Sequence, residues 1–289
     1  MFKREEKHVT DSEAIRSLPH NRKEVFFDLL KNRKMTLLTI SVFTFLFFIP
    51  LAVDLFYFNF LETAAIAAGH EDHLFSLVFY SMLIMIPCML VGFLGLAGSF
   101  YVIKKLVWQE GITVSTDFFA GVKDGWKHAL INGAIFGVLL FALVVGGSYL
   151  IIFSPISPVI SGIGIGALIL VFLVFGMVLA IVETQDVYYQ NSYGITFRNA
   201  FYLLGLMNWR ILLVFLLSTG VVVALSCLNL ITLGIGLLLF AFLNSVVVTL
   251  YTLISHSAFD KYINFDHYPD MVGKGLYKVS EDVKDDKEA

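Results

Sequence analysis

The fold of this chain is decided by residues 129–182, ALINGAIFGVLLFALVVGGSYLIIFSPISPVISGIGIGALILVFLVFGMVLAIV, a stretch without Asp, Glu, Lys or Arg. A single helix of this length would be about 80 Å long, whereas the hydrocarbon core of a bilayer is roughly 30 Å thick. Residues 154–158 (SPISP) interrupt the stretch near its middle, and proline does not continue a helix. The stretch therefore predicts two membrane-spanning helices joined by a turn.

Other apolar stretches raise the expected number of spans to six. Residues 35–58 and 74–103 are each long enough to cross a bilayer, and residues 59–73 between them read as a short polar loop. Residues 211–259 are again uncharged, with the expected turn at residues 229–232. A re-entrant hairpin is the alternative there, because irregular backbone is tolerated in a membrane where protein buries it. The predicted fold is an all-α, polytopic membrane helix bundle.

The composition agrees with a membrane protein. Of the 289 residues 58% are hydrophobic and 15% are charged, whereas a soluble domain carries about 25% charged residues. The net charge of −3 gives no indication of a nucleic-acid partner. The first 34 residues are polar, so no cleavable signal peptide is expected and the first apolar segment acts as an uncleaved anchor. No P-loop or nucleophile elbow is present, so neither an enzyme nor a cofactor is expected.

The basic residues predict the orientation. All 20 Lys and Arg lie in residues 1–34, in the 104–127 loop, at Arg198 and Arg210, or in the C-terminal tail. The three other loops of the six-span arrangement have none, so the positive-inside rule places both termini in the cytoplasm. The expected division is a cytoplasmic N-terminal amphipathic segment, a six-span membrane domain and a cytoplasmic C-terminal tail, residues 1–34, 35–259 and 260–289.

A motif recurs at an offset of 83 residues. Gly111-Ile112-Thr113 returns as Gly194-Ile195-Thr196. The same offset matches three further pairs, Phe118 with Phe201, Trp126 with Trp209, and Lys127 with Arg210. The pattern predicts a duplicated unit of span, cytoplasmic amphipathic helix and span, related by an axis along the membrane normal.

The loop helix of each copy is the candidate interaction surface. Thr116 is expected to cap the first of these helices, with Asp117 in its first turn. One face then gathers aromatic residues and is predicted to lie in the membrane interface, where it meets lipid or a partner subunit. The candidate interaction residues of the two copies are Phe118, Phe119, Trp126, Lys127, Trp209 and Arg210.

Three segments resemble a known family. They are SFYVIKKLVWQEGITVSTDFFAGVKDGWKHALINGA (99–134), ETQDVYYQNSYGITFRNAFYLLGLMNWRI (183–211) and FDKYIN (259–264). They are similar to the YesL-type bacterial membrane proteins. The resemblance implies a multi-pass protein of the bacterial cytoplasmic membrane, without catalytic activity, that serves as an accessory or assembly partner of a carbohydrate uptake system of the ATP-binding-cassette type. The alternative is a small-solute transporter or channel with its path between the two repeats.

Several polar residues within the spans are candidate sites. Asp54 is interpreted either as a hydrogen-bonded structural carboxylate or as a substrate or proton site, because an ionisable group within a span is costly. Asn132 and Asn244 also lie within spans, and hydrogen bonds between helices are expected to satisfy both. Glu183 and Asp186, at the end of the fourth span, are expected to pair with Lys or Arg of neighbouring loops.

Two other patterns have a functional and a structural interpretation. His70-Glu71-Asp72-His73 is the densest set of metal-ligand side chains, but its histidines do not have the i, i+4 zinc spacing, so no metal is predicted. The glycines of the spans are expected to bring helices close together, and a ligand groove is the alternative. These glycines are Gly92, Gly95, Gly98, Gly133, Gly137, Gly162, Gly164 and Gly166.

Overall fold

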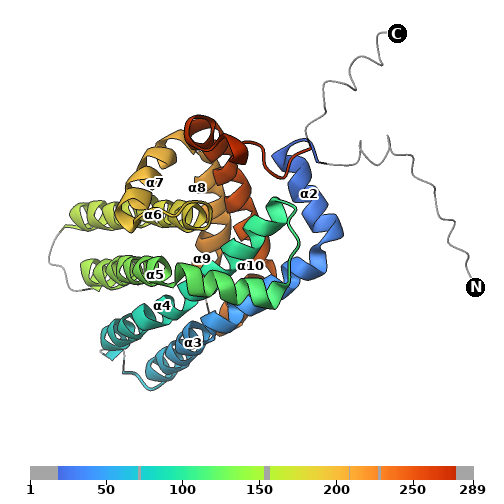
Figure 1. Ribbon diagram of the computed structural model, residues 1–289. Helices are drawn as coiled ribbons and strands as arrows, with labels where there is room; N and C mark the ends of the chain where they lie inside the picture. The colour runs from blue at the N-terminus through green and yellow to red at the C-terminus, as the bar shows by residue number, and fades with distance from the viewer. Residues whose placement is uncertain (1–18, 71–72, 153–156, 208, 227–228, 278–289) are drawn as a thin grey trace, which may run out of the picture.

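The computed structural model describes residues 19–70, 73–152, 157–207, 209–226 and 229–277, and this part of the chain is helical without a strand. Five helices in it are long and apolar enough to cross a membrane, and they pack into one bundle (Figure 1). They are α3 (Lys34–Ala67), α4 (Leu74–Val107), α5 (Val114–Ile152), α6 (Pro158–Tyr188) and α10 (Leu230–Phe259). The predicted all-α membrane bundle is confirmed.

A bent segment supplies the remaining apolar helix. Helix α7 (Tyr193–Met207) makes an angle of 104° with residues 209–225. Those residues form α8 (Trp209–Phe215), the π-helix η2 (Leu216–Gly220) and most of α9 (Val221–Ser226). They are about 26 Å long at 1.5 Å per residue, close to the hydrocarbon thickness. The described residues therefore hold five spans, or six where the bent pair counts as one.

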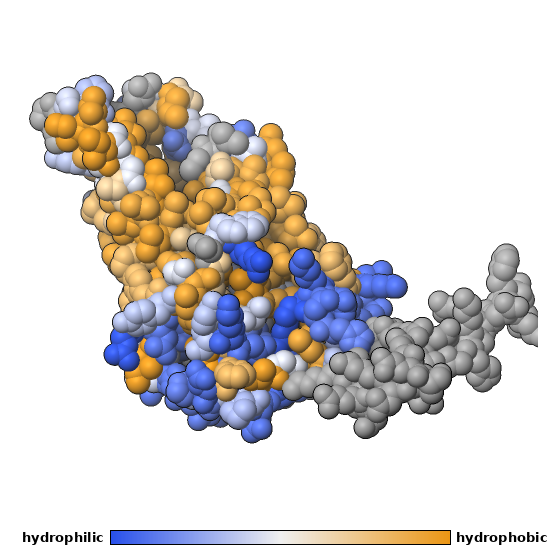
Figure 2. Space-filling model, turned by 90° about the horizontal axis from the view of Figure 1, so that it is seen from above, coloured by the Kyte–Doolittle hydropathy of each residue, from blue (hydrophilic) through white to orange (hydrophobic). Residues whose placement is uncertain are grey.

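The remaining described elements are short and gather at one end of the bundle. They are α2 (Arg22–Asn32), the π-helix η3 (Asp260–Asn264), α11 (Phe265–His267) and the 3-10 helix η4 (Pro269–Met271). This end also contains the α4–α5 connection, and we call it the basic end (Figure 1). The opposite end, where α3 and α5 end and α4 and α6 begin, is called the hairpin end. Figure 2 shows apolar side chains over the long helices and hydrophilic side chains gathered at the basic end.

Two predicted boundaries need correction. Residues 59–67 were expected in a loop, but they continue α3, because residues 61–68 (LETAAIAA) are mostly good helix formers. Residues 229–232 were expected to form a turn, but they begin α10. Asn229 caps this helix by accepting hydrogen bonds from the backbone N–H groups of Ile231 and Thr232, both at 3.0 Å. Residues 227 and 228, which precede Asn229, are outside the described residues.

The prediction of a separate interfacial helix that begins near Thr116 is wrong for the first copy of the motif. Helix α5 runs without a break from Val114, and Asp117 caps it by accepting a 2.8 Å hydrogen bond from the backbone N–H of Thr113. Phe118 is fully buried against Gly98 of α4. The motif therefore packs along α4 instead of lying apart in the interface.

Glycines explain how close α4 and α5 come. A Cβ atom on Gly133 would lie 2.8 Å from the carbonyl oxygen of Met89, and one on Gly137 would lie 3.1 Å from the Cα of Ile86. Backbone atoms do not move aside easily, so only glycine fits at Gly133. The packing interpretation is confirmed there. It does not extend to Gly166, which has nothing within 4 Å.

A polar cluster, the basic-end clamp, joins three helices. It consists of Arg22 (α2), Trp108 (after α4), His256 (α10) and Asp260 (η3). The indole N–H of Trp108 donates to Nε2 of His256 over 3.1 Å, so Nδ1 is the protonated nitrogen of a neutral His256 ring, and it lies 3.3 Å from Oδ2 of Asp260. Arg22 donates to the same carboxylate oxygen over 2.8 Å. The cluster closes the bundle at this end.

Candidate functional site

A cavity of about 700 Å³ inside the bundle is the candidate site. One face of α4 lines it, since its lining residues recur every three or four positions: Val78, Met82, Met85, Met89, Phe93, Leu96 and Phe100. From Val78 to Phe100 this face is about 33 Å long at 1.5 Å per residue, close to the thickness of the hydrocarbon core. The cavity is therefore elongated along the bundle.

Helix α10 lines the cavity with a matching face, which includes Leu237, Phe240, Asn244, Val247, Val248 and Tyr251. Helix α3 contributes at the hairpin end, through residues such as Asn59 and Glu62, and α6 contributes at the other end, through Leu179, Ala180 and Glu183. Residues of α5, α8, η2 and α9 complete the wall. The volume falls within the range of about 300–1,000 Å³ that is typical of small-molecule sites.

The wall of the cavity is apolar with a few polar groups. Phe, Leu, Val and Met supply most of the lining, and the polar lining residues are Asn59, Glu62, Thr63, Glu183, Ser218, Thr219, Asn229, Asn244 and Tyr251. Glu62 and Glu183 are the charged residues among them. No Lys, Arg or His of the described residues lines this cavity.

Glu183 is held by a chain of hydrogen bonds across three helices. Its carboxylate is almost completely buried, and its Oε1 accepts a 2.8 Å hydrogen bond from Nδ2 of Asn132 on α5. The Tyr193 hydroxyl of α7 donates to Oδ1 of the same Asn132 over 2.7 Å. The expectation that Asn132 is satisfied by hydrogen bonds between helices is confirmed.

A second pair lies one helical turn away. Nδ1 of His128 and Oδ1 of Asp186 are 2.8 Å apart, and the His128 ring meets the edge of the Tyr193 ring with 5.2 Å between centroids. Asp186 and Glu183 were expected to pair with Lys or Arg, and this is wrong within the described residues. Because α5 and α6 pack side by side, His128 and Asn132 on one helix meet Asp186 and Glu183 on the other.

Asn244 is the unsatisfied polar group of the site. Its side chain is buried and lines the cavity, and its Nδ2 has no hydrogen-bond partner in the described part of the chain. The prediction that hydrogen bonds between helices satisfy it is wrong for this nitrogen, because α10 turns the amide toward the cavity. A buried amide donor left without a partner costs about 1–3 kcal/mol, so the position favours a ligand with an acceptor.

The π-helix η2 forms the wall beside Asn244's helix. Ser218 donates its hydroxyl to the carbonyl oxygen of Val214 over 2.7 Å and lies 3.4 Å from the Tyr251 hydroxyl. Both Ser218 and Tyr251 line the cavity. Single π-helical turns within α-helices are frequent at functional sites, since they redirect side chains. Nothing in the sequence pattern signalled this turn.

The other intramembrane candidate, Asp54, lies outside the cavity. It is buried between α3 and α4, where the Ser81 hydroxyl donates to its Oδ2 over 3.2 Å. This arrangement agrees with the structural interpretation of Asp54. Of the metal candidates, the His70 and His73 rings lie 6.0 Å apart, while Glu71 and Asp72 are outside the described residues. Among the described residues no three His, Cys, Asp or Glu side chains gather around one point.

The candidate interaction residues divide into two groups. Phe118 is fully buried, so its predicted contact with lipid or a partner is wrong. Phe119, Trp126 and Trp209 are exposed by 53%, 47% and 64%. Lys127 lies beside Trp126, with Nζ 5.7 Å from the ring centroid, and Arg210 is exposed next to Trp209. These residues remain available to lipid or to a partner.

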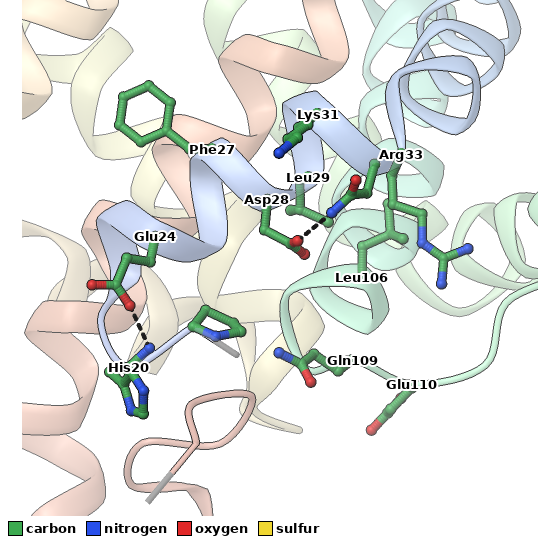
Figure 3. A pocket seen from close by; sticks show the side chains of 12 residues that line it. His20, Glu24, Phe27, Asp28, Leu29, Lys31, Arg33, Leu106, Gln109 and Glu110 are labelled. Atoms are coloured by element: carbon green, nitrogen blue, oxygen red, sulfur yellow. Dashed lines mark hydrogen bonds between the residues drawn. The ribbon is translucent and has the colours of Figure 1, made fainter. Parts of the chain in front are cut away.

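A second hollow, of about 750 Å³, lies at the basic end between α2 and the end of α4 (Figure 3). Several of its polar groups bond to one another. Glu24 accepts from the backbone N–H of His20 over 2.6 Å, and Asn32 donates to Asp28 over 2.6 Å. These are ordinary contacts around a helix start and along one helix face, so we regard the intramembrane cavity as the stronger candidate.

The two long walls, the buried carboxylate of Glu183 and the Asn244 amide together enclose an elongated, largely apolar space with a few polar groups along it. Comparison with known proteins identifies no relative of this chain. No family model matches the chain, and no curated protein and no solved structure matches it.

Proposed function

We propose that this protein is a small-solute transporter that binds an apolar or amphiphilic molecule in its intramembrane cavity. The observation that carries the proposal is the cavity of about 700 Å³, lined over most of its length by one face of α4 and one face of α10. Membrane helices that only support one another pack closely, as α4 and α5 do through Gly133. The opposed faces of α4 and α10 instead leave space along the bundle.

The chemistry of the walls favours an adaptable site for an apolar body. Met82, Met85 and Met89 follow one another along the α4 face. Methionine side chains are flexible and polarisable, so they adjust to ligands of different shape. The polar residues Asn59 and Glu62 at the hairpin end would meet the polar part of an entering amphiphile.

The proposal places the basic end in the cytoplasm, in agreement with the distribution of Lys and Arg. A single cysteine introduced at Ser157 should react with an impermeant thiol reagent in intact cells, whereas one at Lys123 should not. Both side chains are exposed, so accessibility from one side of the membrane decides the outcome. Labelling of the Lys123 position from outside would reverse the orientation.

Dye binding to the purified protein tests the cavity itself. The neutral apolar dye N-phenyl-1-naphthylamine should bind to the wild-type protein in mild detergent, with protein-free micelles as the blank. Val247→Trp places a large side chain in the cavity and should weaken dye binding by about tenfold or more. The control is Val246→Trp, because Val246 is the neighbouring residue and is not among the lining residues. Equal binding by wild type and Val247→Trp would refute the proposed site.

A second candidate function is the accessory role beside a carbohydrate uptake system. Phe119 and Trp126 favour it, because two large aromatic side chains are exposed near the basic end. Such residues often dominate the affinity of protein interfaces. The same exposure suits a lipid-facing surface, so the cavity supports the transporter more directly.

A further inference from the structure

We propose that the cavity selects lipophilic cations, and that the Glu183 carboxylate holds either the cation or a proton. This inference rests on the proposed function, which leaves the charge of the solute open. The positive charge of the solute follows from the groups that line the cavity and from the partners of Glu183.

The charged groups of the cavity are all acidic. Glu183 is buried near one end and Glu62 is half-buried near the other, and no basic residue of the described chain lines the space between them. An anionic solute would meet two carboxylates and no counter-charge. An organic cation would find a counter-charge in an apolar surrounding, where the attraction between opposite charges is strong.

Glu183 has no cationic partner among the described residues. Its hydrogen-bond donor is the neutral amide of Asn132, and the nearby imidazole of His128 is paired with Asp186. Lys104, at the end of α4, donates to the carbonyl oxygen of Val187, one helical turn beyond Glu183 on α6, over 2.6 Å. A buried carboxylate without a counter-charge is costly, so Glu183 is stable when it is protonated or when a cation neutralises it.

The other titratable groups around Glu183 leave this conclusion unchanged. On its own helix Asp186 is the neighbouring acid, and its Oδ1 lies 2.8 Å from Nδ1 of His128 of α5. On α7 the Tyr193 hydroxyl acts through Asn132, and on α10 the Tyr251 hydroxyl lines the same cavity. The α4 face between Met89 and Phe100 carries no titratable residue. The α8 residue that lines the cavity is Phe215, which is not titratable either.

The geometry gives separate roles to the carboxylate and its amide partner. The Asn132 amide donates a hydrogen bond to Oε1 of Glu183, and the Tyr193 hydroxyl fixes the orientation of that amide by donating to its oxygen. This leaves Oε2 for a proton or for the charge of the solute. Asn132 is therefore a positioning residue, and Glu183 is the binding residue. Aromatic side chains of the wall, such as Phe93 and Phe136, offer ring faces that also attract cations.

Two probes of matched shape and opposite charge test the inference. The purified full-length protein in mild detergent should bind tetraphenylphosphonium at least about tenfold more tightly than tetraphenylborate, which is the effect expected of one buried counter-charge. Binding of tetraphenylphosphonium should strengthen as the pH rises, because the cation then competes with fewer protons at Glu183.

Variants locate the effect. Glu183→Gln has the same size and keeps an acceptor for Asn132, and it should lose the preference for the cation and its pH dependence while still binding the neutral dye. Glu183→Asp keeps a carboxylate and should retain a preference. Asp54→Asn is the matched control, because Asp54 is a buried acid within a span that does not line the cavity, and it should retain the preference as well as the pH dependence.

The outcomes separate this inference from the proposed function. If wild type binds the neutral dye but does not distinguish the two ions, the cation inference is wrong and the cavity remains a binding site. The same conclusion follows if Glu183→Gln keeps the preference. Should Glu183→Gln fail to fold, loss of the preference in a dye-binding Glu183→Asp would overturn the role of the carboxylate. If wild type binds neither dye nor ions, both proposals fall.

Discussion

Residues 114–137 and 197–220 carry the same motif at an offset of 83, yet they follow different courses. The first is the beginning of α5, one continuous helix of 39 residues. The second is divided among α7, α8 and η2, with a bend of 104° between α7 and the residues after it. The predicted repeat therefore does not give the two copies the same helix course. It remains a prediction that the two complete units of span, amphipathic helix and span superpose about an axis along the membrane normal.

Glycine positions account for this difference. Gly121 and Gly133 of α5 face α4 so closely that a Cβ atom on either would collide with it. The corresponding positions in the second copy are Leu204 and Leu216. Leucine does not allow such an approach, so the second copy cannot lie along a neighbour in the same way.

The difference has a functional side. The first copy serves as a scaffold, because α4 and α5 share the most extensive helix contact of the bundle. The second copy is free of that contact and places Leu217, Ser218 and Thr219 of η2 in the cavity wall, to which the first copy contributes Phe136.

The largest expected effect contrasts Phe118 with Phe201. Phe118→Ala should lower the free energy of unfolding by about 3–5 kcal/mol, because the ring is fully buried and leaves a cavity. Phe201→Ala should cost less than about 1 kcal/mol, because Phe201 is 37% exposed. Unfolding in mixed micelles with increasing denaturing detergent measures both. Equal losses would show that the two copies are packed alike.

The second test inserts leucine where the second copy has it. Gly133→Leu should destabilise the protein by about 1–3 kcal/mol or more, because the new side chain meets the backbone of α4. Gly166→Leu is the control and should change stability by no more than about 0.5 kcal/mol, since Gly166 has open space around it. Thermal unfolding in detergent measures both. A stable Gly133→Leu protein would contradict the glycine explanation.

The third test loosens the connection between the two copies. Tyr193→Phe removes the hydrogen bond from α7 to Asn132 of α5 and should cost about 1 kcal/mol. Hydrogen exchange of the α7 amides should then become faster. Tyr202→Phe, on the same helix but 70% exposed, is the control. Unchanged exchange in Tyr193→Phe would mean that packing alone holds α7.

The smallest effect on stability is expected at the exposed residues of the first copy. The double variant Phe119→Ala with Trp126→Ala should stay within about 0.5 kcal/mol of wild type for each change, because neither side chain is buried. If a partner docks there, the variant should lose the protein that co-purifies with wild type. A variant that retains every partner at wild-type yield would leave only the membrane-facing role.

Much of the fold could be predicted from the sequence, because spans depend on local composition. The SPISP segment placed the start of α6 correctly, with Pro158 as its first residue and Ser157 as its N-cap. Lipid requires every backbone polar group to bond within its own helix, so a long uncharged stretch has few alternative structures. The course of α5 was not predictable in this way, because it depends on a contact with α4.

The candidate site was predictable only in part. Asn132 and Asn244 were recognisable as polar residues within spans, but their roles differ because of how each helix is rotated about its axis. The cavity-lining face from Val78 to Phe100 has a regular helical spacing, and a closely packed face would have the same spacing. Glu183 directly follows the uncharged stretch, so the sequence predicts that it pairs with Lys or Arg of a neighbouring loop and gives no sign of its place in the cavity wall.

The basic-end clamp has a consequence for synthesis. Arg22 and its partner Asp260 are 238 residues apart in the chain. At about 5–20 residues per second, a ribosome takes roughly 10–50 s to make the second after the first. Helix α2 therefore lacks its partner until α10 and Asp260 have been made. A truncated chain without Asp260 does not form the clamp. The clamp therefore forms only in a chain whose last span has been made.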